Sequence, residues 1–149
     1  MILRLIFVAV LFASTLFAAD HEAEYAALKA RATAIKVSDQ DKFYAQLALR
    51  ATEVANEQYT AGNITKAQAT IDEAVTYAEK AHDAAAGSNK NLKQTEITLR
   101  ETSRRLEELR RSLALEDRPY VETAINRIED IRKKLLDQMF GPKKPKEKK

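Results

Sequence analysis

The sequence has no cysteine and no tryptophan, and its 149 residues include only three glycines, three prolines and two histidines. Without cysteine there is no disulfide bond, no lipid-attachment site and no thiolate nucleophile. His21 and His82 are too far apart in sequence for a His-x-x-x-His metal pair, and there is no Ser-His-Asp grouping or glycine-rich phosphate loop. These absences predict a protein that is not an enzyme, has no cofactor and has no evident small-molecule substrate.

Alanine is the abundant residue, with 25 copies in the chain, while aromatic residues make up only 7%. Alanine has the highest helix propensity but buries little area, so alanine-rich helices approach closely through contacts that are individually weak. The sequence shows no strand-like alternation of apolar and polar residues. We therefore predict an all-α fold whose stability comes from helix packing alone.

The first residues of the chain, MILRLIFVAVLFASTLFAAD, have the pattern of a secretory signal peptide. Arg4 precedes an apolar run that ends at Ala13, and small residues follow. The run is too short and wrongly flanked for a stable membrane span. We predict a signal peptide over residues 1–18, with cleavage after Ala18 or Ala19, and hence a protein that is exported, periplasmic or secreted. An uncleaved N-terminal anchor is the alternative.

The formal net charge of +3 is unevenly distributed. Residues 141–149 carry five lysines and one glutamate, a charge of +4, and Arg4 adds one more, so residues 19–140 carry 3 − 4 − 1 = −2. The positive net charge of the chain therefore comes from its C-terminal residues. Arginines of the body alternate with glutamates that neutralise them, and we predict no nucleic-acid partner. These residues are Arg100, Arg104, Arg105, Arg110, Arg111 and Arg118, with Glu96, Glu101, Glu107, Glu108 and Glu116.

Apolar spacing, together with the few glycines and prolines, divides the body into five helical segments. Ser38 and Asp41 have the spacing of a capping box before the second segment. Gly62, Gly87 and Gly141 stand where the second, third and fifth segments end. The predicted helices cover residues 20–36, 39–61, 64–86, 89–115 and 119–140.

The loops between these helices are short, which favours antiparallel neighbours. We expect a helical domain over residues 20–140, built from the hairpins 39–86 and 89–140 with the N-terminal helix added. The predicted architecture is an antiparallel bundle of four to five helices. An elongated form, in which the second hairpin projects as a coiled-coil-like arm, is the alternative.

Leucines recur every seven residues in the fourth segment, as in a coiled-coil seam, although Thr95 and Thr102 interrupt the pattern. Two places are open for these leucines. They form a surface for a protein partner or for self-association, or they pack on the fifth helix of the same chain. The interface candidates are Leu92, Leu99, Leu106, Leu109 and Leu113.

One helical hairpin carries a family resemblance. Its residues are Ala51, Val54, Ala55, Tyr59, Gly62, Asn63, Ile64, Ala67, Ile71 and Ala74. This set resembles the core of one tetratricopeptide repeat, and the Ala-rich hairpin also looks like those of small bacterial envelope proteins of unknown function. Ile64 replaces the usual aromatic residue, the downstream proline is missing near Glu79, and no second copy follows at a spacing near 34. The hairpin is therefore interpreted as structural, with a direct partner surface as the alternative.

His21 defines one candidate metal site. If cleavage follows Ala18, the mature chain begins Ala19-Asp20-His21, which resembles the amino-terminal Cu(II)/Ni(II) motif. A free amine, two deprotonated amides and the imidazole would give these metals the square-planar nitrogen ligands they prefer. Cleavage after Ala19 removes the site, because the histidine then stands second.

The C-terminal segment GPKKPKEKK has no apolar residue to bury beyond its prolines, and we predict that residues 141–149 form a disordered tail. One function is electrostatic attachment to an anionic envelope surface, and the alternative is a solubilising terminus. The lysines concerned are Lys143, Lys144, Lys146, Lys148 and Lys149.

Together these patterns predict an exported, non-enzymatic helical protein that acts through protein–protein contact or as a structural component of the cell envelope. A Cu(II)/Ni(II)-binding envelope protein and a surface-associated protein held by its lysine tail are the alternatives.

Overall fold

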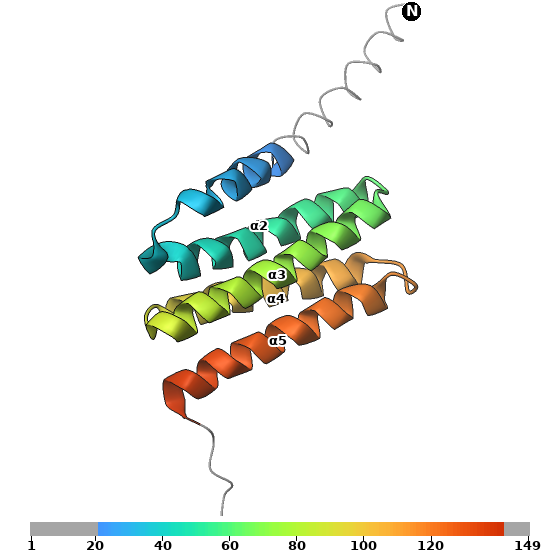
Figure 1. The fold of residues 1–149 in the computed structure, drawn as a ribbon. Helices are drawn as coiled ribbons and strands as arrows, with labels where there is room; N and C mark the ends of the chain where they lie inside the picture. The colour runs from blue at the N-terminus through green and yellow to red at the C-terminus, as the bar shows by residue number, and fades with distance from the viewer. Residues whose placement is uncertain (1–20, 142–149) are drawn as a thin grey trace, which may run out of the picture.

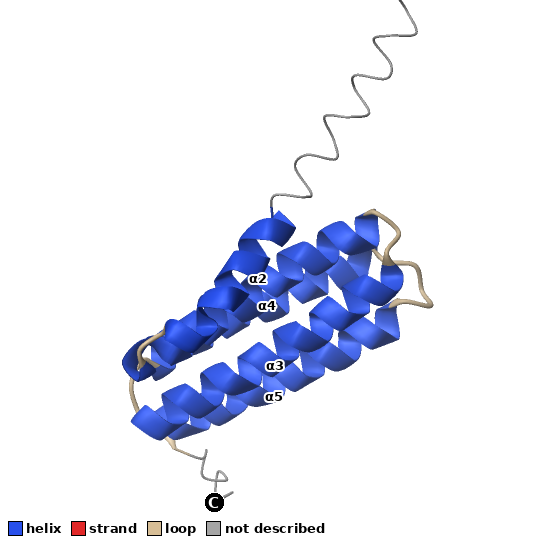
Figure 2. Cartoon of the chain, turned by 45° about the horizontal axis from the view of Figure 1, so that its top comes forward, coloured by secondary structure: helices blue, strands red, loops and turns tan. Residues whose placement is uncertain are grey.

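The computed structural model describes residues 21–141, and every regular element in that range is helical (Figure 1, Figure 2). The predicted all-α class is confirmed. The predicted signal peptide and the tail lysines lie outside the described residues. The elements are an N-terminal helix over residues 21–31, the 3-10 turns Ala32–Ala34 (η1) and Val37–Asp39 (η2), and the helices Gln40–Thr60 (α2), Ile64–Ser88 (α3), Leu92–Ser112 (α4) and Arg118–Phe140 (α5).

The four long helices form two antiparallel hairpins, α2–α3 and α4–α5, stacked side by side in the same direction. In this stack α2 packs on α4 and α3 packs on α5. Both hairpin turns therefore lie at one end of the bundle, on the right in Figure 1, while the α3–α4 link and the end of α5 lie at the other. The second hairpin lies along the first, so the chain adopts the predicted bundle and not the elongated alternative.

The buried positions of α3 recur 50 residues later in α5. The recurrence pairs Ile71, Ala74, Ala78, Ala81 and Ala85 with Val121, Ala124, Ile128, Ile131 and Leu135. Direct contacts follow the same register: the Tyr120 hydroxyl donates to the Asp72 carboxylate at 2.7 Å, and Arg127 pairs with Glu79, each contact joining residues 48 apart. The two hairpins are thus structural equivalents separated by about 50 residues, a longer period than the 34 of the resemblance.

The two hairpins contribute different side chains to one core. The first hairpin supplies mainly alanines, which let α2 and α3 approach closely, while α4 and α5 supply leucine and isoleucine. The fully buried alanines of this core are Ala45, Ala48, Ala55, Ala67, Ala78, Ala81 and Ala85. Large residues of the second hairpin fill the space that small residues of the first leave.

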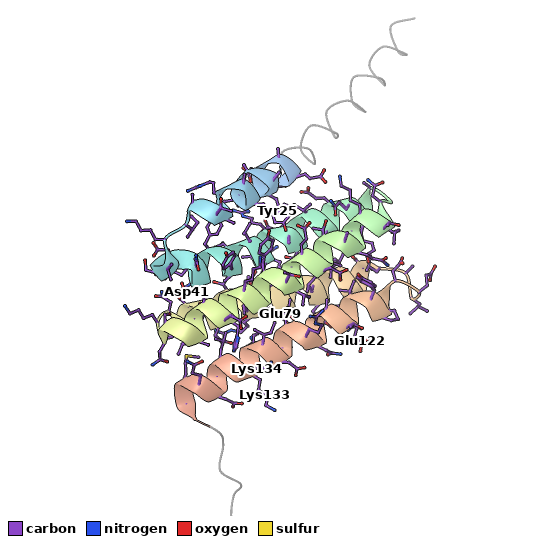
Figure 3. All side chains as sticks on the ribbon, viewed as in Figure 1. Tyr25, Asp41, Glu79, Glu122, Lys133 and Lys134 are labelled. Atoms are coloured by element: carbon purple, nitrogen blue, oxygen red, sulfur yellow. The ribbon has the colours of Figure 1, made fainter. Side chains whose placement is uncertain are left out.

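The N-terminal helix packs on α2 and α3 and forms a second, smaller cluster with them. Tyr25 is its one buried side chain, set against Leu47, Ala51 and Val54 (Figure 3). The Tyr25 hydroxyl donates to Glu73 of α3 at 2.6 Å, and burial together with this carboxylate raises the pKa of Tyr25. Leu28 and Ala32 are partly buried against the same cluster, so Tyr25 is the central but not the sole apolar contact of this segment.

Several predicted helix ends are corrected. Asp39 precedes α2 and its side chain makes no capping bond, so the capping box at Ser38 and Asp41 is wrong. Asp41 is instead buried and accepts from the Asn91 side chain at 3.1 Å, which ties α2 to the α3–α4 link. Gly87 does not end α3, because the helix continues to Ser88 and Asn89 takes the left-handed conformation, with φ 53°.

The two other glycine caps are confirmed. Gly62 has φ +79° and Gly141 has φ +75°, the left-handed region that glycine adopts without a Cβ clash. Asn63 stands at the predicted start of α3, but its side chain makes no capping hydrogen bond.

Candidate groove between α2 and α4

A surface groove of about 420 Å³ runs between α2 and α4. Thr52 and Leu109, which are both buried, form its floor. The walls carry polar and charged side chains. These are Arg50, Glu53, Asn56 and Glu57 from α2, Arg105, Glu108 and Ser112 from α4, and His21 at the start of the N-terminal helix.

Helical spacing explains why these side chains meet. On α2, Arg50, Glu53 and Glu57 follow at i, i+3 and i+7, a stripe on one face of a helix. On α4, Arg105, Glu108 and Ser112 have the same spacing. Because α2 and α4 run in the same direction, the two polar stripes lie along one another and leave a straight groove between them.

The charges of the groove have both signs, and each is paired within the chain. Arg50 donates to Glu53 at 2.8 Å, Arg105 donates to Glu101 at 3.0 Å, and Glu108 accepts from Arg104. Exposed pairs of this kind contribute little stability, because water screens them and ordering both side chains costs entropy. They are therefore free to exchange partners with a bound molecule at small cost.

His21 contacts Glu57 in the groove. Its Nδ1 atom lies against one carboxylate oxygen of Glu57, and the hydrogen bond and charge of that carboxylate raise the pKa of His21. The other oxygen, Oε2, is buried and has no hydrogen-bond partner among residues 21–141. The contact thus joins the N-terminal helix to α2.

The predicted metal site at His21 remains a prediction. Its other ligands would be the amine and amides of residues 19–21, which the described residues do not include in full. Within residues 21–141, no group of three or more histidine, aspartate or glutamate side chains is close enough to hold a metal ion. The imidazole nitrogen that contacts Glu57 would have to leave it for that nitrogen to bind a metal.

An ion-pair network covers the outer flank of the second hairpin. The Arg132 guanidinium donates to one Glu96 oxygen through Nη2 at 2.7 Å and Nε at 3.1 Å, and to both oxygens of Glu129 at 2.7 Å. Arg100 reaches Glu96 at 3.3 Å. Burial of Arg132 lowers its pKa, but the hydrogen bonds with Glu96 and Glu129 outweigh this effect and raise it. This polar flank closes the stack on the side where a further hairpin would pack.

A second hollow, of about 360 Å³, lies between α3 and α5. Figure 3 labels two of its lining residues, Glu79 and Lys134. Its other charged lining residues include Arg127, which pairs with Glu79, and His82, whose Nδ1 lies 3.0 Å from Asp83. Like the α2–α4 groove, the hollow carries charges of both signs, but it is lined by residues of α3 and α5 alone.

The candidate leucines lie in the core of the chain. Leu99, Leu106 and Leu109 are buried, while Leu92 and Leu113 are partly buried against the same cluster. They therefore pack against neighbouring helices of the same chain, which was one of the two arrangements that the sequence left open. From the sequence, only His21 and Leu109 of the groove were candidate site residues, each for another role, and the groove was not predicted. The signal for the groove was the matching i, i+3, i+7 polar spacing on α2 and α4, which becomes visible only when the stacking of the hairpins is known.

Comparisons with protein-family profiles, with curated proteins and with solved structures find no match to this chain. Within the described part of the chain, no helix combines the length and the apolar character needed to cross a membrane.

Proposed function

We propose that this is an exported, non-enzymatic protein that binds another protein in the groove between α2 and α4. The observation that carries the proposal is the groove itself, which is about 420 Å³ in volume and lined by side chains of both charges. The N-terminal helix packs on α2 and α3, and the Glu96–Arg132 network joins α4 to α5. The remaining side carries the smaller hollow between α3 and α5.

The chemistry of the groove favours a protein partner over other classes. A nucleic acid would need a surface of one sign, whereas Glu53, Glu57 and Glu108 here face Arg50 and Arg105. A small-molecule site is typically enclosed and mainly apolar, whereas this groove is open and polar. Mixed charges set the register and association rate of a protein partner, and we assign the groove to a partner helix that carries residues of both signs.

A photo-crosslinking amino acid at Asn56 tests the groove in the native envelope. Asn56 is exposed and lines the groove, while Asn126 is an equally exposed asparagine on α5 outside it. We expect a discrete crosslinked protein from position 56 and none from position 126, with mass spectrometry identifying the partner. Equal crosslinking at both positions, or crosslinking at 126 alone, would contradict the assignment.

Export is supported by the pattern of residues 1–18. Intact mass of the protein recovered from its host tests it. We expect a chain that begins at Ala19 or Asp20, and a chain that retains Met1 would favour the uncleaved anchor. The same measurement decides whether His21 stands third, as the metal alternative requires.

A further inference from the structure

The two ends of the bundle differ in charge. The end opposite the hairpin turns, called here the tail end, consists of residues 36–42, 88–93 and 133–141. It carries six lysines and three carboxylates, a net charge of +3. The turn end, residues 21–24, 57–66 and 110–120, carries four basic and five acidic side chains, a net charge of −1. The lysines of the tail end are Lys36, Lys42, Lys90, Lys93, Lys133 and Lys134.

Exposed apolar side chains collect at the same end. Of the five large apolar residues exposed in the described part of the chain, Val37, Leu136 and Phe140 lie at the tail end. Phe140 is the most exposed, at 80%. Among residues 21–141 nothing covers most of the Phe140 ring, so together with Leu136 and Val37 it leaves apolar surface at this end that a partner can cover.

One face of α5 combines both features. Lys133, Leu136 and Phe140 follow at i, i+3 and i+7, so they lie along one stripe at the end of the helix. Figure 3 shows Lys133 pointing away from the bundle. Immediately after Phe140 the sequence adds five lysines and one glutamate, or +4.

We infer that the tail end of the bundle docks on an anionic lipid surface, with Phe140 inserting among the headgroups and the lysines binding their phosphates. Each lysine near such a surface contributes about 1 kcal/mol, and lasting attachment takes a polybasic patch together with an apolar group. Lysine stems also lie favourably along the apolar boundary while their ammonium groups stay in water. This inference extends the predicted role of the lysine tail to the folded body, and it is independent of the groove.

The absence of tryptophan makes the insertion directly measurable. In Phe140→Trp the reporter stands at the proposed insertion point, and in Leu115→Trp it stands at an equally open position, 74% exposed, at the turn end. Both proteins are titrated with phosphatidylcholine vesicles that contain or lack phosphatidylglycerol. We expect blue-shifted emission from position 140 only, only with phosphatidylglycerol, and less of it as salt rises.

Phe140→Ala should weaken binding to anionic vesicles on the order of tenfold, because it removes the apolar contact. Removal of residues 142–149 should weaken it more strongly. Vesicle binding without a blue shift at position 140, an equal shift at position 115, or binding to soluble polyphosphate with no binding to vesicles would each overturn the inference. Arg105→Glu in the groove should leave vesicle binding unchanged, so failure of the groove proposal and failure of this one are distinguishable.

Discussion

The partly buried ion pair between Glu96 and Arg132 gives the sharpest stability prediction. The Glu96 side chain is 8% exposed and that of Arg132 is 16% exposed. Glu96→Gln keeps the shape of the side chain but removes its charge and weakens the two hydrogen bonds from Arg132. A charge-assisted hydrogen bond contributes about 1.5–3 kcal/mol, and breaking a buried pair on one side costs about 3–5 kcal/mol. Because Glu129 still neutralises the guanidinium, we expect a loss at or below the lower end of that last range, about 2–3 kcal/mol in the free energy of unfolding.

The matched control is Glu101→Gln on the same helix. Glu101 accepts from Arg104 and Arg105, and these hydrogen bonds lower its pKa to about 2. That carboxylate is nevertheless exposed, so water replaces the arginines when its charge is lost. Glu101→Gln should therefore leave stability nearly unchanged, although the pKa of Glu101 is strongly lowered.

Urea unfolding followed by the helical circular dichroism signal measures both variants. Replacing both partners, as in Glu96→Leu with Arg132→Leu, should restore much of the stability, because no charge is then left buried without a partner. Equal unfolding midpoints for Glu96→Gln and Glu101→Gln would refute the reasoning. They would mean that burial does not increase the contribution of the Glu96–Arg132 pair to stability.

Three further predictions use single positions. Gly62→Ala should destabilise the protein by about 1 kcal/mol because φ at this position is +79°. Gly87→Ala lies inside α3 with nothing within 4 Å of the added Cβ, and it should stabilise the protein by about 0.5–1 kcal/mol. Thermal unfolding of the two variants shows whether the two effects have opposite signs. The pKa of His21 in the folded protein lies above 6.5, so its contribution to docking the N-terminal helix is complete below pH 6.5 and is lost as pH rises through the folded pKa. Hydrogen exchange over residues 21–31 should show this pH dependence. Glu57→Gln should abolish it. Leu106→Ala should cost about 3–5 kcal/mol in urea unfolding while leaving the sedimentation of the protein unchanged, whereas a change of oligomeric state at a stability cost under 1 kcal/mol would favour the interface alternative.

The helices could be predicted from the sequence because their signals are local. Apolar periodicity gives the core face of each helix, and Gly62 and Gly141 mark two ends through a backbone conformation that glycine adopts most easily. The error at Ser38 has a tertiary cause, because Asp41 accepts from Asn91, 50 residues away, and does not bond back to Ser38. The error at Gly87 is local, because Asn89 takes the left-handed position two residues later.

The stacking of the hairpins, and with it the groove, could not be predicted in this way. Equivalent positions differ in size, as at Ala78 and Ile128, because a small residue in one hairpin faces a large one in the other. A structural repeat can therefore be present without a sequence repeat. The leucine pattern of α4 is visible in the sequence because these leucines fill the space that the alanines leave. The surface that remains for a partner is the polar one.

The two proposed surfaces are compatible because they lie at different heights along the same bundle. The tail end contains the start of α2, whereas the groove begins at Arg50 and ends near Glu57. At a rise of 1.5 Å per residue these positions stand about 15–25 Å from Gln40. A protein docked by Phe140 and its lysines would therefore hold the groove clear of the headgroups, open to a partner. If so, crosslinking from Asn56 should persist on anionic vesicles, and its loss there would mean that membrane and partner compete for one surface.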